Sequence, residues 1–281
     1  MAQLDDVITV VILTHEEEIH IARCINSALK LSKSIKVIDS GTGRTAEICN
    51  EMSVPVWIKP CSTFSEKLNW AVDNLPINTP WILRLDADEV LTQEFISCVA
   101  ATLASLPSAV SGCYVRRQLW FLGKWIRRGG MYPTYSMRLW RSGSVYCEHR
   151  PLDEHMILRF GTSVNIDLDI IDDPLKSFDD WVEKHVRYSR LELRTEDDEK
   201  CEQQIKPFLF GRQEQRKRWL KLRVYSAVPL FLRPTLYFIY RYLLRLGFLD
   251  GRRGFLFHLM HAYWYRMLVD ARIYEERLRQ K

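Results

Sequence analysis

The chain lacks several patterns that would assign it to a common class of protein. Its 281 residues contain no run of about 18 uncharged apolar residues, so we expect no conventional membrane-spanning helix. The seven cysteines form no Cys-x-x-Cys pair, which disfavours a zinc knuckle or a disulfide framework and favours free thiols in a reducing compartment. The first apolar run, 7–13, is short and follows two aspartates, which disfavours a secretory signal peptide.

Two nucleotide-binding signatures are missing as well. The sequence has neither G-x-G-x-x-G nor G-x-x-x-x-G-K-[ST], which disfavours dinucleotide-binding and P-loop chemistry. Glycine and proline, at 12 and 11 residues, are too few for a low-complexity chain. With 47% hydrophobic and 27% charged residues, the composition is that of a globular protein, either one large domain or one domain with an appendage.

The net charge of +5 is the sum of two segments of opposite sign. Residues 204–281 hold 17 Lys and Arg against 5 Asp and Glu, whereas residues 1–203 hold 23 against 30. The acidic segment suits a divalent cation, and the basic segment suits an anionic partner. We therefore expect one domain at 1–205 and a basic, aromatic helical region at 206–281.

Short apolar runs alternate with helical patterns in the first half of the chain. Strands are predicted at 7–13, 35–39, 54–58 and 81–85, with helices at 17–31, 45–52 and 65–75. This alternation is typical of βαβ units and predicts an α/β fold with a parallel sheet. Polar clusters follow three of the strands, at 14–17, 39–43 and 86–89. Because ligands bind at the carboxyl ends of such strands, we expect a site there.

The second half changes character after about residue 111. Shorter strands are predicted at 113–118, 136–140, 144–147 and 156–160, and Ser177 is expected to cap an amphipathic helix. Two apolar, aromatic helices follow, at 234–246 and 253–278. In the first of them Arg241 and Arg245 are expected to form a narrow polar stripe, and the remaining circumference is too apolar to face water.

The most informative motif is Leu-Asp-Ala-Asp-Glu at 85–89, directly after a predicted buried strand. Two carboxylates one residue apart, Asp86 and Asp88, could share a divalent cation and a diphosphate, because Mg²⁺ and Mn²⁺ prefer carboxylate and phosphate oxygens. The cation would neutralise the charge that develops on a diphosphate leaving group. The alternative is an acidic loop that caps the helix beginning near Thr92.

Three further positions offer matching chemistry. Asp39, at a strand end, could accept hydrogen bonds from a base or a ribose, or it could simply form a turn. Asp153 and Glu154 could supply the base that deprotonates an acceptor hydroxyl, or they could form a surface turn after Pro151. Among six arginines around Gly-Gly at 129–130, we expect Arg138 to bind phosphate.

These residues together resemble a known family, the family-two inverting glycosyltransferases. The likeness is carried by the Val-Val-Ile-Leu-Thr run ending at Thr14, the acidic pair beginning at Glu17, and the motifs at 38–40, 68–71, 85–89, 121–126, 129–130, 132–133 and 153–155. The chain looks most like the bacterial branch that builds lipopolysaccharide core, capsule and exopolysaccharide, which often ends in Leu-Arg-Leu-Gly-Phe-Leu-Asp-Gly, as here at 244–251.

The resemblance implies a GT-A fold, a Rossmann-like mixed sheet with a C-terminal amphipathic helical appendage. Residues 1–110 would form the nucleotide-binding half and 111–205 the acceptor half. It implies Mg²⁺ or Mn²⁺ as cofactor and a UDP-sugar as donor. The implied site consists of Thr14, Glu17, Asp39, Asn69, Asp86 and Arg138 at the nucleotide-sugar, Asp88 at the metal, and Asp153 or Glu154 as base.

Two positions depart from the family pattern, both on the nucleotide side. Glu16 stands where the opening motif usually has Asn. The loop after Asp39 is one residue short, and Gly43 replaces an expected Asp.

We therefore expect a metal-dependent inverting transferase that moves a sugar to a bacterial surface glycan or lipid-linked acceptor. A nucleotidyltransferase and a non-catalytic scaffold of a glycan-synthesis complex are the alternatives. The basic, aromatic region at 206–281 predicts docking on the cytoplasmic face of the inner membrane, or else packing on the catalytic domain or in a homo-oligomer. Nucleic-acid binding is not expected, because the aromatic residues follow a helix face rather than a stacking platform.

Overall fold

The computed structural model describes residues 4–150, 152–197 and 205–280 and divides into two compact units. Unit 1 holds Met1–Trp120, Tyr135–His149 and Glu154–Leu175, and unit 2 holds Phe121–Thr134, Arg150–Asp153 and Lys176–Lys281. The domain boundary expected at 205 stays a prediction, because it adjoins residues 198–204, which lie outside the described residues. The six described cysteines are free thiols, and Cys201 lies outside the described part.

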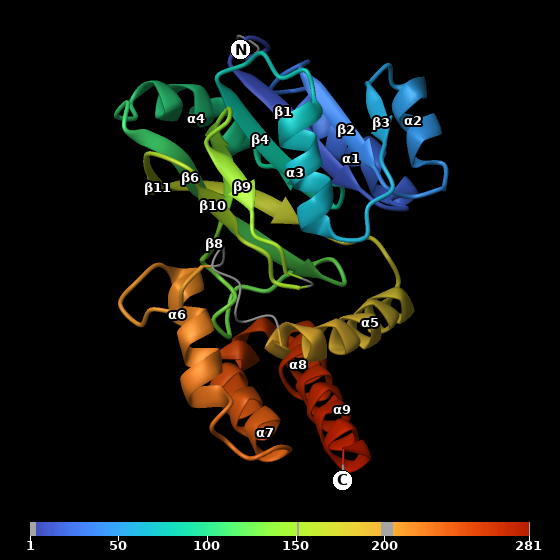
Figure 1. Ribbon diagram of the computed structural model, residues 1–281, viewed down its shortest axis with the longest axis vertical. Helices are drawn as coiled ribbons and strands as arrows, with labels where there is room; N and C mark the ends of the chain where they lie inside the picture. Colours follow the sequence, from blue (N-terminus) through green and yellow to red (C-terminus); the bar gives the residue numbers. More distant parts are fainter. Residues whose placement is uncertain (1–3, 151, 198–204, 281) are drawn as a thin grey trace. The chain divides into compact units, whose positions relative to one another are not determined.

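The first half of unit 1 is a parallel sheet whose strands alternate with helices (Figure 1). Its elements are β1 (Ile8–Thr14), α1 (Glu18–Ala28), β2 (Ile35–Asp39), α2 (Thr45–Glu51), β3 (Val56–Ile58), α3 (Phe64–Asn74) and β4 (Trp81–Asp86). Strands β3, β2, β1 and β4 lie side by side in that order and are all parallel. The predicted alternation is confirmed, with strand ends within two residues of the prediction.

The second half of unit 1 extends this sheet with strands of both directions. They are β5 (Glu89–Leu91), β6 (Val110–Phe121), β8 (Thr134–Arg141) and β11 (Thr162–Asp172), with α4 (Gln93–Ala104) between the first two and a separate hairpin of β9 (Val145–Cys147) and β10 (Met156–Leu158). The order continues from β4 as β8-β6-β11-β5, and β8 runs antiparallel to β4. The predicted mixed α/β sheet is therefore confirmed, but β11 was not predicted.

Two apolar layers cover the two faces of the sheet. Because side chains alternate along a strand, Ile8, Val10 and Ile12 of β1 pack with α1, whereas Val11 and Leu13 pack on the other face with α3. All five side chains are buried, as expected for a parallel strand covered on both faces. This double burial fixes the register of β1, and with it the position of the residues at its carboxyl end.

Unit 2 consists mainly of helices. Besides the short strand β7 (Lys124–Trp125), it contains α5 (Phe178–Asp197), α6 (Gln213–Leu220), α7 (Leu232–Ile239), α8 (Gly251–His258) and α9 (Tyr265–Arg279). π-helical turns extend α6, α7 and α8, at Lys221–Tyr225, Tyr240–Leu244 and Leu259–Trp264. Ser177 accepts the backbone N–H of Asp180 at 3.1 Å, so its predicted capping of α5 is confirmed. Among the described residues, no helix is both long and apolar enough to cross a bilayer.

A buried ion-pair cluster around Glu192 ties the helices of unit 2 together. One carboxylate oxygen of Glu192 lies 2.6 Å from both Lys221 Nζ and Arg266 Nη1, and the other accepts the Tyr265 hydroxyl at 2.6 Å. Burial alone would raise the pKa of Glu192, but the charges of Arg266 and Lys221 outweigh it and hold the pKa well below its ordinary value of 4.5. The cluster therefore depends on an ionised Glu192.

Glu192→Gln is expected to lower the free energy of unfolding by about 3–5 kcal/mol near neutral pH, because it leaves buried cations without their carboxylate. The depressed folded-state pKa makes this contribution present above the unfolded value of 4.5 and lost as the pH falls below it. Urea denaturation of both chains as a function of pH should show the deficit shrinking in that window. Glu183→Gln, an exposed change on the same helix, is the control and should cost little at any pH. An equal deficit at all pH values would contradict the prediction.

Candidate active site

The register of the parallel strands brings three predicted site residues into one row. Thr14 pairs with Asp39 across β1 and β2, and the residue before Thr14 pairs with Asp86 across β1 and β4. Thr14 and Asp39 are buried, whereas Asp86 keeps 30% of its side-chain surface exposed. Asp39 accepts the backbone N–H of Gly41 at 3.1 Å through Oδ1, but its Oδ2 and the Thr14 hydroxyl have no hydrogen-bond partner among the described residues.

Lys67 contacts Thr14 in this row, and it is a residue that the sequence analysis missed. It lies on α3, is buried, and donates from Nζ to the backbone carbonyl of Thr14 at 2.7 Å. Burial lowers the pKa of Lys67, while the negative charge of Asp39 acts in the opposite direction. A signal was available, because Lys67 stands one helical turn before the buried Ala71, on the face that α3 turns toward the sheet.

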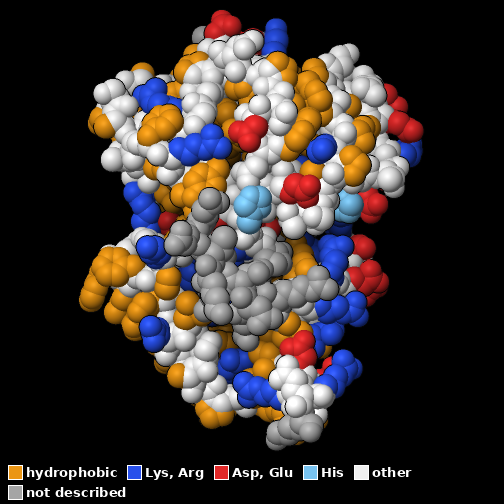
Figure 2. All heavy atoms as spheres, in the orientation of Figure 1, with side chains coloured by type: hydrophobic (Ala, Val, Ile, Leu, Met, Phe, Trp, Pro, Cys, Tyr) orange, Lys and Arg blue, Asp and Glu red, His pale blue; other side chains and the backbone are white. Residues whose placement is uncertain are grey.

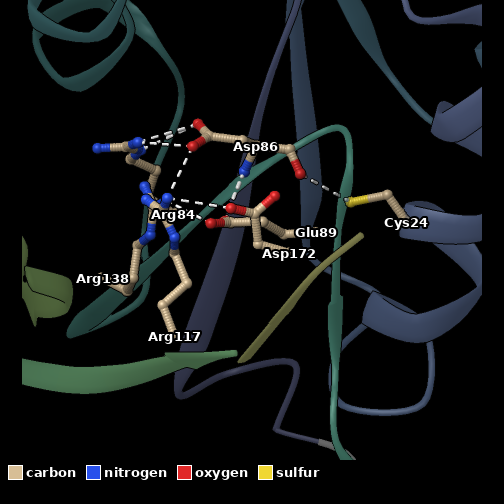
Figure 3. A network of polar contacts seen from close by, with 7 residues as sticks. All are labelled: Cys24, Arg84, Asp86, Glu89, Arg117, Arg138 and Asp172. Carbon is tan, nitrogen blue, oxygen red and sulfur yellow. Dashed lines mark hydrogen bonds and ion pairs between the residues drawn. The ribbon is translucent and has the colours of Figure 1, made fainter. Parts of the chain in front are cut away.

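Asp86 is held by an arginine on each of two strands (Figure 3). Arg84 Nη2 lies 3.0 and 2.9 Å from the two carboxylate oxygens, and Arg138 Nη2 lies 2.8 Å from Oδ2. Burial raises the pKa of Asp86, but the charges of Arg138 and Arg84 outweigh it and hold the pKa well below its ordinary range. Asp86 is therefore an ionised carboxylate with a fixed orientation.

The same network contains a second and a third carboxylate. Arg138 also pairs with Glu89, whose other oxygen accepts the backbone N–H of Asp86 at 3.0 Å, and Arg117 lies 3.0 Å from Asp172. Burial raises the pKa of Glu89, and the neighbouring charge of Asp86 adds to that effect. Figure 3 shows these side chains converging from β4, β5, β6, β8 and β11. Three arginines thus balance three carboxylates.

Arg138, the predicted phosphate contact, is engaged by carboxylates in the structure. Only 1% of its surface is exposed, and its guanidinium pairs with Asp86 and Glu89 inside unit 1. Both contacts are made by Nη2, whereas Nε and Nη1 are buried without a hydrogen-bond partner among the described residues. Arg138 positions Asp86, and its contact with a phosphate stays a prediction.

The turn after Asp86 is clamped on its other side. The backbone carbonyl of Asp88 accepts Arg23 Nη2 at 3.2 Å and the backbone N–H of Asp173 at 3.2 Å, and Arg23 also pairs with the Asp173 carboxylate at 2.8 Å. Asp88 itself is half-buried. The turn that carries the predicted metal ligand is thus fixed by Arg23 of α1 and by Asp173, the residue after β11.

These residues fit a divalent cation that is bound mainly by its substrate. In residues 4–150, 152–197 and 205–280, no group of three or more His, Cys, Asp or Glu is arranged to hold a metal. The Asp86 carboxylate is engaged by arginines, and Asp88 is the carboxylate of the motif that the family resemblance places at a cation. One carboxylate together with phosphate oxygens is an ordinary ligand set for Mg²⁺, so the donor chemistry fits.

The two departures from the family pattern pack against each other. A Cβ atom at Gly41 would lie 2.9 Å from the backbone nitrogen of Glu16, and one at Gly43 would lie 2.3 Å from Glu18 Oε1. That Glu18 oxygen also accepts the backbone N–H of Arg44 at 2.6 Å. A side chain at position 43 would therefore displace the Glu18 carboxylate from its contact with Arg44.

Glu17 and Asn69 lie near the row but are engaged in other contacts. The Glu17 carboxylate lies 2.5 Å from Nδ1 of the buried His20, whose Nε2 accepts the backbone N–H of Leu175 at 2.7 Å. Asn69 uses both ends of its amide on the backbone of Cys147, at 3.0 and 2.8 Å. Asn69 therefore fastens α3 to the β9–β10 hairpin. Contacts of Glu17 and Asn69 with a donor stay predictions.

The two candidate bases fall in different units. Glu154 belongs to unit 1, in the loop between β9 and β10, where the buried Glu148 accepts the backbone N–H of His155 at 3.0 Å. Burial raises the pKa of the Cys147 thiol to about 12. The charge of Arg84 acts to lower this pKa, and the charge of Glu154 acts to raise it. Asp153 belongs to unit 2 and is exposed, with a positive φ of 61°.

A family model described as glycosyl transferase family 2 matches residues 9–153, just over half of the chain. The chain belongs to glycosyl transferase family 2. The match includes the strand-end row and the 85–89 motif, so the sheet edge described above lies within the part that defines the family. Family membership also decides against the alternative of a nucleotidyltransferase.

This family 2 chain is similar to glycosyltransferases of two Rickettsia species. It is 34% identical over 88 residues to an uncharacterized glycosyltransferase of Rickettsia typhi, and this alignment covers 31% of this chain and 30% of the relative. A glycosyltransferase of Rickettsia conorii is 34% identical over 92 residues, 32% of each chain. The alignments thus span about a third of the length of these relatives.

The family 2 chain can also be superposed on solved structures. Staphylococcus aureus TarS, residues 1–349, gives a TM-score of 0.48 at 14% identity, covering 98% of this chain and 91% of that one. Mannosyl-3-phosphoglycerate synthase of Rubrobacter xylanophilus gives 0.46 at 12% identity, covering 72% and 77%. Glucosyl-3-phosphoglycerate synthase of Mycobacterium tuberculosis, crystallised with Mn²⁺ and UDP, gives 0.34 at 17% identity, covering 41% and 44%.

Arg138→Met is expected to lower the free energy of unfolding by about 3–5 kcal/mol, because Asp86 and Glu89 would lose a shared buried cation. Chemical denaturation of the purified variant measures the loss. The control is Arg44→Met, which removes an arginine whose side chain is 72% exposed and should change stability by about 0.5 kcal/mol or less. A variant at position 138 as stable as the wild type would show that the network does not stabilise the fold.

Proposed function

We propose that the chain transfers a sugar, with inversion, from a nucleotide-diphospho-sugar to a hydroxyl group of an acceptor, in a reaction that depends on Mg²⁺ or Mn²⁺. The observation that carries the proposal is the placement of Asp39 and Asp86 at the ends of β2 and β4, with Asp88 two residues further along the chain. The chain that presents these carboxylates belongs to family 2. Carboxylates in this arrangement can bind both the nucleoside and the diphosphate of a donor.

The nucleoside would bind at Thr14 and Asp39. A buried carboxylate oxygen without a partner is unfavourable, so Asp39 Oδ2 gains a hydrogen bond when a base N–H or a ribose hydroxyl reaches it. The loop at 40–44 contacts Asp39 through Gly41 and would have to move aside. Lys67, which donates to the backbone carbonyl of Thr14, would hold the carboxyl end of β1 in place while the nucleoside binds. We take UDP as the nucleotide, as the family resemblance implies.

The diphosphate would bind beside the 86–89 turn. A divalent cation held by Asp88 would neutralise the charge that develops on the leaving diphosphate. Asp86 cannot rotate toward the cation without leaving Arg84 and Arg138, so its part is to fix the turn and present a constant negative charge. Arg23 and Asp173 fix the same turn from the opposite side.

Glu154 is the base that we favour. It lies in the same unit as Asp86, on a hairpin that Asn69 and Glu148 hold by backbone hydrogen bonds, and is half-buried. It would take the proton of the acceptor hydroxyl as that oxygen attacks the anomeric carbon. The bond from that carbon to the diphosphate breaks on the opposite face, so the configuration inverts in one displacement.

The acceptor that we propose is a growing bacterial surface glycan or a lipid-linked precursor of one. Its support is the resemblance of the whole set of motifs, including the segment 244–251, to the branch that builds lipopolysaccharide core, capsule and exopolysaccharide. The alternative of a non-catalytic scaffold would apply if the chain binds no nucleotide-sugar in calorimetry.

Asp88→Asn is expected to reduce sugar transfer by about 10²-fold or more, and EDTA should have a comparable effect on the wild type. The measurement is nucleoside-diphosphate release from a panel of nucleotide-sugars with and without added Mn²⁺. Asp73→Asn, which alters a carboxylate that is 55% exposed, is the matched control and should keep full activity. Full transfer by the position-88 variant together with insensitivity to EDTA would rule out the proposed metal role.

Glu154→Gln is expected to reduce transfer by about 10²–10⁴-fold, because the acceptor hydroxyl loses its base. Calorimetric binding of the nucleoside diphosphate should remain as in the wild type, because Glu154 is placed at the acceptor. Asp153→Asn is the neighbouring control and should retain activity. The opposite result, loss at position 153 and retention at 154, would assign the base to Asp153.

A further inference from the structure

The helix formed by α7 and its π-helical extension exposes its apolar side chains and buries its arginines. Arg241 is 3% exposed and Arg233 is 7% exposed, whereas Leu244 on the same helix is 71% exposed. The exposed apolar residues recur at helical spacing, as Leu232, Leu236, Ile239, Tyr240, Leu243 and Leu244. The predicted polar stripe thus points inward at Arg241 and outward at Arg245, and the apolar circumference that was expected to be covered is exposed.

This orientation is fixed by contacts within unit 2. The guanidinium of Arg233 lies 2.6 Å from the fully buried Asp270 carboxylate. Arg241 donates to the backbone carbonyl of Gly129 at 3.0 Å and lies 2.9 Å from His261 Nδ1. Turning the helix to bury its leucines would break the contacts of both arginines. It would leave the buried Asp270 carboxylate without its ion pair, which is strongly unfavourable. The leucines therefore stay outside.

The exposed apolar surface continues past the end of the helix. Leu246, Phe248 and Leu249 in the following turn are exposed, as is Phe255 on α8. The ring of Tyr242 lies 6.3 Å from that of Phe248 and 5.5 Å from that of Phe255, so turn and helix form one surface. We call this surface, from Leu232 to Leu249 together with Phe255, the outer face. Exposed apolar patches of this extent mark sites of interaction with a protein or a membrane.

The chain segment that forms most of the outer face carries charges of one sign. No Asp or Glu occurs between Glu214 and Asp250, a segment that carries eight Lys and Arg. Asp250 is buried and accepts the backbone N–H of Arg128 at 2.8 Å. We call the end of the face at Leu246, Phe248 and Leu249 its tip. Exposed arginines border the tip, at 127, 128, 245, 252 and 253. Figure 2 shows hydrophobic side chains at the surface around α6 and α7, with Lys and Arg among them.

We propose that the outer face docks in the interface of a lipid bilayer that carries anionic headgroups. The apolar side chains would enter the acyl boundary, and the arginines at the tip would pair with headgroup phosphates. A second copy of the chain fits less well, because a self-complementary contact through this face would bring the arginines of both copies together.

The experiment is flotation of the full chain with vesicles of phosphatidylcholine, with and without phosphatidylglycerol, in the absence of detergent. We expect the chain to float with the anionic vesicles and to do so less at high salt. The double variant Leu243→Glu/Leu244→Glu should lower the bound fraction about 10-fold, and Arg252→Glu/Arg253→Glu should remove the preference for phosphatidylglycerol.

Ile58→Glu is the matched control, because Ile58 is an exposed aliphatic residue of β3, in unit 1. It should float like the wild type, and circular dichroism should show that all variants are folded. Failure to float with either vesicle, or binding that none of the variants at the outer face changes, would overturn the proposal. Light scattering that shows a dimer, dissociated by Leu243→Glu/Leu244→Glu, with no flotation would assign the face to a second copy instead. Neither readout depends on sugar transfer, so the proposed activity is tested separately.

Discussion

The double role of Arg138 is the interaction on which the site in unit 1 depends. One guanidinium on β8 serves Asp86 at the end of β4 and Glu89 at the start of β5. It thereby joins the parallel half of the sheet to its mixed half at the point where the chain turns through Asp88. The pairing makes burial of the carboxylates tolerable, since an unpaired carboxylate in this place would either take up a proton or unfold the turn. The orientation of the 86–89 turn is thus a property of the whole sheet rather than of a local sequence.

Much of the fold could be predicted because the relevant signals are local. Strand β2 was predicted with its observed bounds, since Ile35–Asp39 is a short run between a helix end and a Gly-rich loop. The row of Thr14, Asp39 and Asp86 followed from the rule that ligands collect at the ends of parallel strands. Strand β11 was missed, although its residues 164–170 alternate apolar and polar side chains as a half-buried strand does.

What could not be predicted depends on partners far apart in the sequence. Arg138 and Asp86 are 52 residues apart, and Arg233 and Asp270 are 37 apart. A helical pattern gives the spacing of its apolar side chains but does not say which side faces inward. Because the apolar side of a helix is usually buried, the leucines would be expected to face inward. In α7 and its π-helical extension the leucines lie outside instead, because Arg233 pairs with Asp270 and Arg241 donates to the carbonyl of Gly129 on the inner side.

Helix α3 has a consequence for how the two halves of a reaction could influence each other. A single residue separates Lys67, which donates to the end of β1, from Asn69, which holds both backbone groups of Cys147 on β9. A single helical turn is thereby bonded to the strand end at the proposed nucleoside site and to the hairpin that carries Glu154. Because a helical turn moves as a rigid piece, a shift at either end is transmitted to the other over this short span. One lysine and one asparagine would thus link the proposed nucleoside site mechanically to the proposed base.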